Sequence, residues 1–343
     1  MGLEAPETIE EWETVLRAFK EQDPNGNGKP DEIPYLHSQT DVNRNFLLTG
    51  AWGIGTNFYQ VDGKVKFGVI QPEYKEYLET MHRWYDEGLI DRDYAATDDK
   101  LKDAKVTNNQ VGIFIGSTGG GIGKYLTLMK DDPSFQLAAL PYPTRVKGER
   151  PIVGQKDAVF NGLGAAITVD NKNPEATVKW LDYAYSEEGS YLFNFGIEGE
   201  SYNWVDGYPK YSDTVMKNPD GLPVNQAMSL YARASYAGPF VQDRRYMEQY
   251  AERPEQRESI EIWMKPVNQI HLPLLSLTSE ESSKFSSIMT DINTYKDEML
   301  SKFIMGTVSL DTFDNFVSTI KNMGLDEAIA IQQAALDRYH ARQ

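Results

Sequence analysis

The decapeptide DPNGNGKPDE, at residues 23–32, is the most informative stretch of the chain. Side-chain oxygens recur at alternate positions, and two glycines between them let the backbone bend sharply. A calcium ion binds about six to eight oxygen atoms, supplied by carboxylates, amides and backbone carbonyls. A bent loop with this spacing can turn successive oxygens toward one point. The stretch therefore predicts a structural calcium site.

The first half of this loop matches the D-x-[DN]-x-[DN]-G start of an EF-hand loop. The second half departs from it, because an EF-hand closes with a glutamate at the position that Pro34 occupies here. A polar turn is the alternative interpretation, since these residue types form turns for local reasons. The predicted metal ligands are the side chains of Asp23, Asn25, Asn27, Asp31 and Glu32 and the backbone carbonyl of Lys29.

Composition limits the classes of protein that need to be considered. The 343 residues are enough for two domains, and 40% hydrophobic with 25% charged residues is typical of a soluble globular protein. The net charge of −17 argues against a nucleic-acid partner and against docking on anionic lipid. The chain has no cysteine, so disulfides, thiolate metal sites and a cysteine nucleophile are excluded.

Neither a membrane span nor a signal peptide is predicted. No stretch approaches the roughly 20 apolar residues that a spanning helix needs. The first six residues, MGLEAP, lack the basic and apolar regions of a signal peptide. The 20 tyrosines and 6 tryptophans are a hint of sugar binding, because flat apolar rings cover the C–H faces of pyranoses, although large cores use such residues too.

Helices are predicted from capping signals and apolar periodicity. Thr8 and Glu11 form a capping box ahead of the first helix, and Pro72 begins another that ends at Gly88. Further helices are expected at 98–107, 173–186 and 279–303, from Ser309 to Gly324, and at 325–339. Three tryptophans lie on apolar faces of these helices and are expected in the core: Trp12, Trp84 and Trp180.

Strands are expected at 33–36, 111–115, 135–140 and 162–169. A hairpin is predicted around Asp62-Gly63. The aromatic stretches 196–207 and 231–250 are expected to have no regular secondary structure. The glycine-rich run GSTGGGIGK at 116–124 follows a predicted strand. It fits neither the P-loop nor the dinucleotide fingerprint, but such a turn can present backbone N–H groups to a ligand.

No catalytic constellation is evident. The four histidines are scattered without an H-x-x-x-H pair, which disfavours a zinc enzyme. No G-x-S-x-G elbow is present for a serine hydrolase. A glycosidase carboxylate pair stays open as an alternative, although no two of the many carboxylates stand out.

Three stretches carry a resemblance to a known family. They are residues 6–20 together with 23–34, residues 195–202 together with 206–209, and residues 290–295 together with 302–306. The chain resembles the extracellular solute-binding proteins of carbohydrate ABC transporters. It is most similar to a branch of large Gram-positive lipoproteins related to alginate-oligosaccharide binders.

The resemblance implies an α/β, periplasmic-binding-protein-like type II fold of two lobes that close on a sugar. Family members bind calcium at the motif matched by residues 23–32, far from the sugar. The chain resembles about the last two-thirds of a member, with most of the N-terminal lobe core missing. Residues 1–160 would be mostly the second lobe, and residues 161–343 would supply returning first-lobe segments, the hinge and the C-terminal helices.

Ligand residues are expected in irregular stretches near family cleft positions, because sugars bind through aromatic stacking and converging polar groups. The predicted set is Asn43, Arg44, Trp52, Ser117, Thr118, Trp204, Arg233 and Tyr236.

The predicted function is that of a non-catalytic protein that captures an oligosaccharide and delivers it to an ABC-transporter permease. The full-length family is extracellular, lipid-anchored and monomeric, whereas a shortened chain would expose surface that can drive self-association. The alternatives are a carbohydrate-active hydrolase or lyase with a structural calcium, and a fragment without ligand binding.

Overall fold

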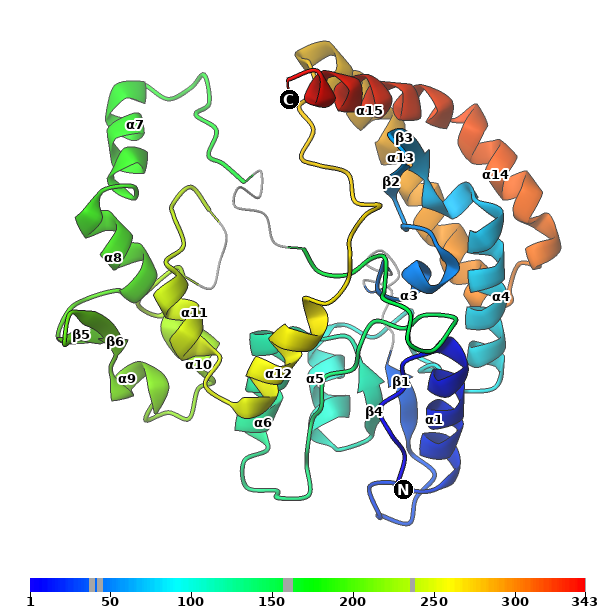
Figure 1. Cartoon of the computed structure of the whole chain (residues 1–343), viewed down its shortest axis with the longest axis horizontal. Helices are drawn as coiled ribbons and strands as arrows, with labels where there is room; N and C mark the ends of the chain where they lie inside the picture. Colours follow the sequence, from blue (N-terminus) through cyan, green and yellow to red (C-terminus); the bar gives the residue numbers. More distant parts are fainter. Residues whose placement is uncertain (37–40, 42–45, 157–162, 235–237, 343) are drawn as a thin grey trace. The chain divides into compact units, whose positions relative to one another are not determined.

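The computed structural model describes residues 1–36, 41, 46–156, 163–234 and 238–342. They form two compact units, each assembled from separate segments of the sequence. The first unit comprises Met1–Ile115, Leu140–Lys156 and Ile262–Gln343, and the second comprises Gly116–Ala139 and Asp157–Glu261. Both units mix helices and strands (Figure 1). Within the described residues, no helix is both long and apolar enough to cross a membrane.

Two pairs of strands lie in the first unit. β1 (Ile33–Leu36) pairs in parallel with β4 (Val111–Phe114), so the strands predicted at these two places are confirmed. β2 (Phe58–Val61) and β3 (Lys64–Phe67) form an antiparallel hairpin. Its turn residues 62 and 63 have φ angles of 51° and 76°, the left-handed conformation that a two-residue hairpin turn requires. The predicted hairpin is confirmed.

The helices of the first unit follow the predicted caps. The Thr8 side chain accepts a bond from the Glu11 backbone N–H, and the Glu11 side chain accepts one from the Thr8 N–H, so the capping box is present. Helix α1 (Ile9–Glu21) begins there and packs on β1. The others are α3 (Phe46–Thr49), η1 (Gly50–Trp52), η2 (Gly68–Ile70), α4 (Pro72–Asp86), α5 (Asp99–Thr107), α13 (Ser279–Ile304), η4 (Leu310–Thr312), α14 (Phe313–Asn322) and α15 (Leu325–His340).

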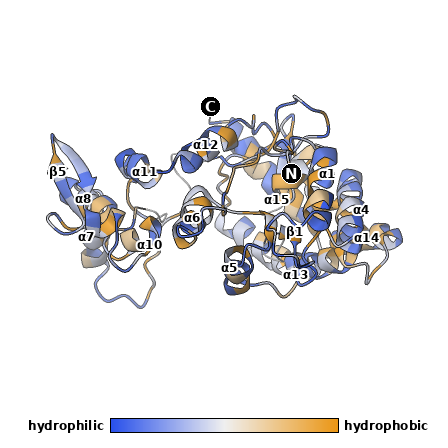
Figure 2. Cartoon of the chain, turned by 90° about the horizontal axis from the view of Figure 1, so that it is seen from below, coloured by the Kyte–Doolittle hydropathy of each residue, from blue (hydrophilic) through white to orange (hydrophobic). Residues whose placement is uncertain are grey.

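A large aromatic core holds this unit together. Helix α13 packs against α4, α14 and α15, which brings residues more than 200 positions apart in the sequence into contact. The helices carry apolar and polar residues side by side, as Figure 2 shows for α1, α4 and α14, and the apolar ones point inward. Full burial of so many rings is a large stabilising term. The largest fully buried side chains include Tyr35, Phe67, Tyr74, Tyr77, Trp84, Phe303 and Phe316.

The second unit has a smaller core around Phe195, Tyr211 and Tyr246. β5 (Tyr202–Val205) and β6 (Tyr208–Tyr211) form its hairpin. The remaining elements are η3 (Thr118–Gly123), α6 (Lys124–Leu128), α7 (Pro174–Tyr183), α8 (Glu187–Phe195), α9 (Asp213–Met216), α10 (Val224–Ser229), α11 (Arg244–Tyr250) and most of α12 (Pro254–Trp263).

Several predictions for this half of the chain are wrong. The strand expected at 135–140 is irregular, and residues 163–169 of the strand expected at 162–169 form no strand and are exposed. An apolar run becomes a strand only when another strand supplies the hydrogen bonds, and no described segment pairs with either run. The stretch expected to be irregular at 196–207 contains β5, and its turn, like the first hairpin's, has Asp-Gly at positions 206–207 with positive φ.

The core assignment of the three tryptophans is right for two of them. Trp12 and Trp84 are buried, but Trp180 on α7 is 71% exposed. Helical spacing shows which residues share a face, whereas burial requires another element to cover that face. Among the described residues none does so for α7, which has no buried residue along its length.

Candidate functional site

The loop between α1 and β1 is folded around its own side-chain oxygens. The Asn27 backbone N–H donates to Asp23 Oδ1 at 3.1 Å and to Asn25 Oδ1 at 3.0 Å. The Gly28 N–H donates to Asp23 Oδ2 at 2.9 Å, and the Lys29 N–H donates to Asn27 Oδ1 at 2.7 Å. The left-handed φ angles of Asp23, Gly26 and Gly28 make these short-range bonds possible. The loop is therefore ordered by the residues that the sequence identified.

Two bonds fasten this loop to the segment before β4. The Asn25 side-chain amide donates to the Asn109 carbonyl at 3.0 Å, and the Gln110 amide donates to Asp31 Oδ2 at 3.2 Å. The Asn27 amide donates to the other carboxylate oxygen of Asp31. The bond from Asn27, followed by the bond from Gln110, lowers the pKa of Asp31 below its usual value. This carboxylate is kept in the charged form that a cation would need.

One buried side-chain oxygen of the loop is left without a partner. Glu32 Oε1 is buried and has no hydrogen bond in the structure. A buried carboxylate oxygen without a partner is costly, and a cation beside it would remove that cost. The described residues contain no group of three or more Asp, Glu, His or Cys side chains placed to hold a metal. The loop is thus suited to a hard cation only if amide and carbonyl oxygens complete the ligand set.

The glycine-rich turn in the second unit has a different organisation. Ser117 caps it by accepting a bond from the Gly120 N–H at 3.1 Å. A Cβ atom on Gly119 would lie 1.1 Å from the phenol oxygen of Tyr250, and one on Gly123 would lie 2.7 Å from the side-chain nitrogen of Gln256. Glycine is required at position 119, because any side chain there would collide with the Tyr250 ring of α11, whereas at Gly123 only the flexible end of the Gln256 side chain would have to shift.

A cavity of about 550 Å³ opens beside this contact, wholly within the second unit. Gly119 and Gly123 form part of its wall, and residues 216–225 and 250–256 form other parts. The volume is in the range of small-molecule sites. One aromatic ring, several amides and charged groups face it together, which is the mixture that a hydroxyl-rich ligand requires. The side chains with the most relevant chemistry are Tyr250, Asn218, Asn225, Gln256, Arg253 and Lys130.

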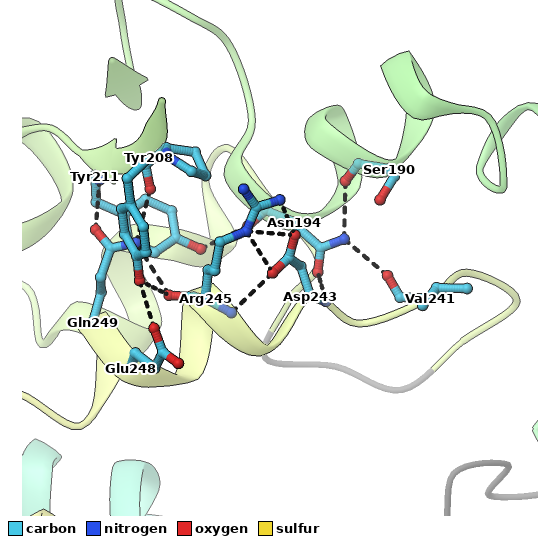
Figure 3. A network of polar contacts seen from close by, with 10 residues as sticks. Ser190, Asn194, Tyr208, Tyr211, Val241, Asp243, Arg245, Glu248 and Gln249 are labelled. Carbon is cyan, nitrogen blue, oxygen red and sulfur yellow. Dashed lines mark hydrogen bonds and ion pairs between the residues drawn. The ribbon is translucent and has the colours of Figure 1, made fainter. Parts of the chain in front are cut away.

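A polar network holds the helix that ends at Tyr250 (Figure 3). Asp243 caps α11 and forms an ion pair with Arg245, whose guanidinium Nε lies 3.0 Å from both carboxylate oxygens. The bond from Arg245 lowers the pKa of Asp243. Asn194 of α8 accepts the Asp243 N–H at 2.7 Å and donates to two backbone carbonyls.

The same network joins α11 to the second hairpin. The Gln249 side chain accepts the Tyr211 N–H at 2.9 Å and donates to the Pro209 carbonyl at 2.9 Å. The phenol of Tyr211 donates to the Asn194 carbonyl at 2.6 Å, and burial raises the pKa of this phenol well above its usual value. With α8, α11 and β6 tied together, Tyr250 is presented to the glycine-rich turn by a fixed scaffold.

Two predicted ligand residues lie in the turn that borders the cavity, although neither is among its lining residues. Ser117 uses its hydroxyl as the cap. The hydroxyls of Thr118 and Ser259 are 2.9 Å apart, and the carbonyl of Thr118 accepts from the Gln256 amide at 3.1 Å. The structure gives both residues local roles in shaping the turn.

The other described candidates lie away from this cavity. Trp52, in the first unit, is 7% exposed and packs edge-on against Tyr77, at the side of a polar groove along α1 and α4. Trp204 on β5 is 39% exposed and packs edge-on against Tyr191. Arg233 is exposed, and its backbone N–H donates to the Phe193 carbonyl. The remaining candidates, Asn43, Arg44 and Tyr236, lie outside the described residues.

Sequence reasoning missed the residues that line the cavity opposite the turn. Tyr250, Arg253 and Gln256 come from a stretch with no ligand motif, and Asn218 and Asn225 lie in a loop and a short helix. The one available signal was the density of glycines at 116–123, which indicates that another part of the chain comes close. It does not indicate which part.

The sequence of this chain is similar to those of known solute-binding proteins. A family model described as bacterial extracellular solute-binding protein matches residues 1–191, more than half of the chain. FusA of Streptococcus pneumoniae, a fructooligosaccharide ABC transporter substrate-binding protein, is 28% identical over an alignment that covers 99% of this chain and 64% of FusA. Lipoprotein LipO of Bacillus subtilis is 23% identical over 95% of this chain and 64% of LipO.

A solved structure agrees with these matches. The alginate-binding protein AlgQ2, in a crystal structure without calcium ion, is 29% identical and has a TM-score of 0.82, covering 97% of this chain and 68% of AlgQ2. The predicted periplasmic-binding-protein-like fold class is thereby confirmed. The chain spans about 64% of the length of FusA and of LipO.

Proposed function

We propose that this chain, which belongs to the bacterial extracellular solute-binding protein family, captures an oligosaccharide and delivers it to the permease of an ABC transporter. Because proteins of this family bind solutes, the chain is not an enzyme, and no catalytic step is assigned to it. The observation that carries the proposal is the cavity of about 550 Å³ beside the glycine-rich turn.

The lining of the cavity supports a sugar as ligand. Sugar hydroxyls both donate and accept hydrogen bonds, and the amides of Asn218, Asn225 and Gln256 can do the same. The ring of Tyr250 offers a flat apolar face to the C–H groups of a pyranose. This chemistry would orient a saccharide without any group that attacks it.

The names of similar proteins point to the same class of ligand. FusA is named for fructooligosaccharides and AlgQ2 for alginate, so both names refer to carbohydrates of more than one sugar unit. FusA is also named as part of an ABC transporter, which supports the permease as partner. The name of LipO supports a lipid-anchored setting outside the cell, in agreement with the extracellular family.

Capture is proposed to work through a shift between open and closed states. A ligand that makes more contacts in the closed state binds that state better and raises its population. The division into a second lobe within residues 1–160 and returning first-lobe segments within 161–343 stays a prediction.

A structural calcium ion in the loop 23–32 is the second part of the proposal. Carboxylates of Asp23, Asp31 and Glu32, the amide oxygens of Asn25 and Asn27 and the Lys29 carbonyl would hold it, once the three carboxylates, which are not grouped for a metal in the described structure, close around the ion. The unpartnered Glu32 Oε1 and the depressed pKa of Asp31 support this donor set. Bound calcium would supply a positive charge that neutralises these oxygens and braces the loop between α1 and β1.

Binding can be tested with a thermal-shift screen in calcium-containing buffer, followed by calorimetry on each hit. The panel contains neutral and uronic oligosaccharides, with their monosaccharides as controls. We expect a specific rise in melting temperature with at least one oligosaccharide, because a ligand that binds only the folded state stabilises it. Cooperative melting without a shift from any saccharide would contradict the proposal, and so would turnover of a bound sugar.

A pair of variants ties any binding to the cavity. Tyr250→Ala removes a ring that lines the cavity, whereas Tyr185→Ala removes one that is 55% exposed elsewhere in the second unit. We expect the first variant to weaken binding about tenfold or more and the second to leave it unchanged. Equal effects of the two would place the sugar elsewhere.

A further inference from the structure

The charges that line the cavity in the second unit differ from those of the chain as a whole. The chain has a net charge of −17, yet among the described residues Lys130, Lys217 and Arg253 line the cavity with a single carboxylate, that of Glu252. Clusters of one sign in a concave site raise the local concentration of ligands of the opposite sign. The local reversal of charge therefore favours an anion over a neutral molecule.

Two of the three cations are available for a ligand. Lys217 lies 3.3 Å from the carboxylate of Asp213, four residues earlier in the chain. No ion pair joins Arg253 or Lys130 to any carboxylate in the part of the chain that the structure describes. A cation held in a cavity without an anionic partner is poised to bind one.

Arg253 is the better placed of the two. It immediately precedes α12 and is partly buried, and its backbone N–H donates to Gln256 Oε1 at 3.2 Å. Its guanidinium Nη2 donates to Thr127 Oγ1 at 3.4 Å, a long and weak bond. The remaining side-chain donors have no acceptor among the described residues, and the planar guanidinium matches a carboxylate through two parallel bonds.

We infer that the cavity recognises an acidic saccharide, one that carries a carboxylate on the sugar ring, with Arg253 binding the carboxylate and Lys130 reinforcing it. The inference rests on the proposed function, because it names the ligand class of that same cavity. Amides and the Tyr250 ring would contact the rest of the sugar, as they would for a neutral one. Arg253 and Lys130 then determine specificity.

Calorimetry with matched ligands tests this inference on the full chain in calcium-containing buffer. One pair is a galacturonate trisaccharide and the galactose trisaccharide of the same linkage, and a second pair is mannuronate and mannose trisaccharides. We expect the uronate trisaccharide that binds more tightly of the two to have a dissociation constant at least about tenfold lower than that of its neutral counterpart. This is the gain in affinity that one charge-assisted hydrogen bond usually gives. Raising the salt concentration from about 0.05 M to about 0.5 M should weaken the binding of the acidic saccharide and leave the binding of the neutral one unchanged.

Variants separate charge recognition from general packing. Arg253→Gln should weaken the binding of the acidic saccharide about tenfold and that of the neutral saccharide less than about threefold. Arg253→Lys should weaken the binding of the acidic saccharide by an intermediate factor. Lys130→Gln should have the same selective effect to a smaller extent, and it keeps the test valid if Arg253→Gln fails to fold, because Lys130 is exposed. Arg244→Gln is the matched control, since this arginine of α11 is exposed and does not line the cavity.

The outcomes distinguish a failure of acidic-saccharide recognition from a failure of saccharide binding as such. Binding of neutral sugars as tight as that of the acids, or an equal loss of both in Arg253→Gln and Lys130→Gln, would overturn the inference and leave the proposed function standing. A complete lack of saccharide binding would overturn the proposed function and the inference with it.

Discussion

Two glycine-containing loops of this protein are specified in opposite ways. The loop 23–32 is held by bonds among its own residues, such as those from Asn27 N–H to Asp23 and Asn25, and two further bonds fasten it to residues 109–110. The glycine-rich turn 116–123 is shaped by Tyr250 and Gln256, the latter 138 positions from its hydrogen-bond partner Thr118.

The difference shows what a local motif can reveal. Where side-chain oxygens and turn glycines alternate within ten residues, the residues that form the loop's hydrogen bonds can be identified from the sequence alone. Where glycine serves to admit a distant side chain, the sequence shows only that space is needed. Variants of each loop test whether its order has the origin that the structure indicates.

The largest loss of stability is expected where the glycine-rich turn contacts Tyr250 of α11. Gly119→Ala places a Cβ atom 1.1 Å from the Tyr250 phenol oxygen and 2.0 Å from its ring carbon Cζ, so the ring and α11 must move. We expect the free energy of unfolding to fall by about 3 kcal/mol, at the upper end for overpacking. Urea unfolding followed by circular dichroism measures the loss.

Two controls show whether the collision is the cause. Gly120→Ala meets nothing closer than the Ser117 hydroxyl, at 3.2 Å, and should cost under about 1 kcal/mol. The double variant Gly119→Ala with Tyr250→Ala should recover part of the loss of the single Gly119 variant, because the colliding ring is gone. A double variant less stable than both single variants combined would show that the contact is not the reason for glycine.

An intermediate effect is expected from calcium at the local loop. At free calcium about a hundredfold above the dissociation constant, chelation should lower the free energy of unfolding by about 2.7 kcal/mol. Asp23→Ala should abolish this sensitivity, since Asp23 provides two oxygens of the loop. Thermal melts with and without chelator measure this sensitivity, and Asp131→Ala, which removes an exposed carboxylate outside the loop, is the control. Equal melting of the wild type with and without chelator would mean that the loop is a self-contained polar turn.

The smallest effect is expected from acid in the absence of calcium. The pKa of Asp31 is lowered by its bonds to Asn27 and Gln110, so the folded state favours the carboxylate. This stabilisation is present above the usual pKa of about 3.8 and is lost as the pH falls through the lower folded-state value. With chelator present, stability measured from pH 6 to pH 3 should fall slightly less steeply in Asp31→Asn. An identical slope in both proteins would contradict the role of this carboxylate.

Local signals predicted much of the fold correctly. The capping box at Thr8 and Glu11, the Asp-Gly turn at 62–63 and the helix from 279 are present because their causes lie within a few residues. The second Asp-Gly turn, at 206–207, carried the same signal. The hairpin there could have been predicted by the rule that identified the first.

Predictions that depended on a distant partner were less successful. Residues 135–140 and 163–169 have the composition of strands but no strand beside them in the described structure, and Trp180 lies on an apolar face that no described element covers. Among the predicted ligand residues, Ser117 and Thr118 border the cavity because they belong to the turn. Tyr250 and Arg253 were missed because their place beside the turn depends on the packing of α11 and α12.

The sequence by itself determined the helices that begin at Ile9, Pro72, Asp99, Ser279 and Leu325, the first hairpin, the family resemblance and the order of the oxygens in residues 23–32, whereas α11 formed in a stretch that was expected to be irregular. Each of these depends on bonds or periodicity within a short segment. Only the tertiary structure decided which aromatic residues are buried, why Gly119 must lack a side chain, and which amides and cations surround one cavity. Those features arise where segments far apart in the chain meet, and the sequence order does not specify the distance between them.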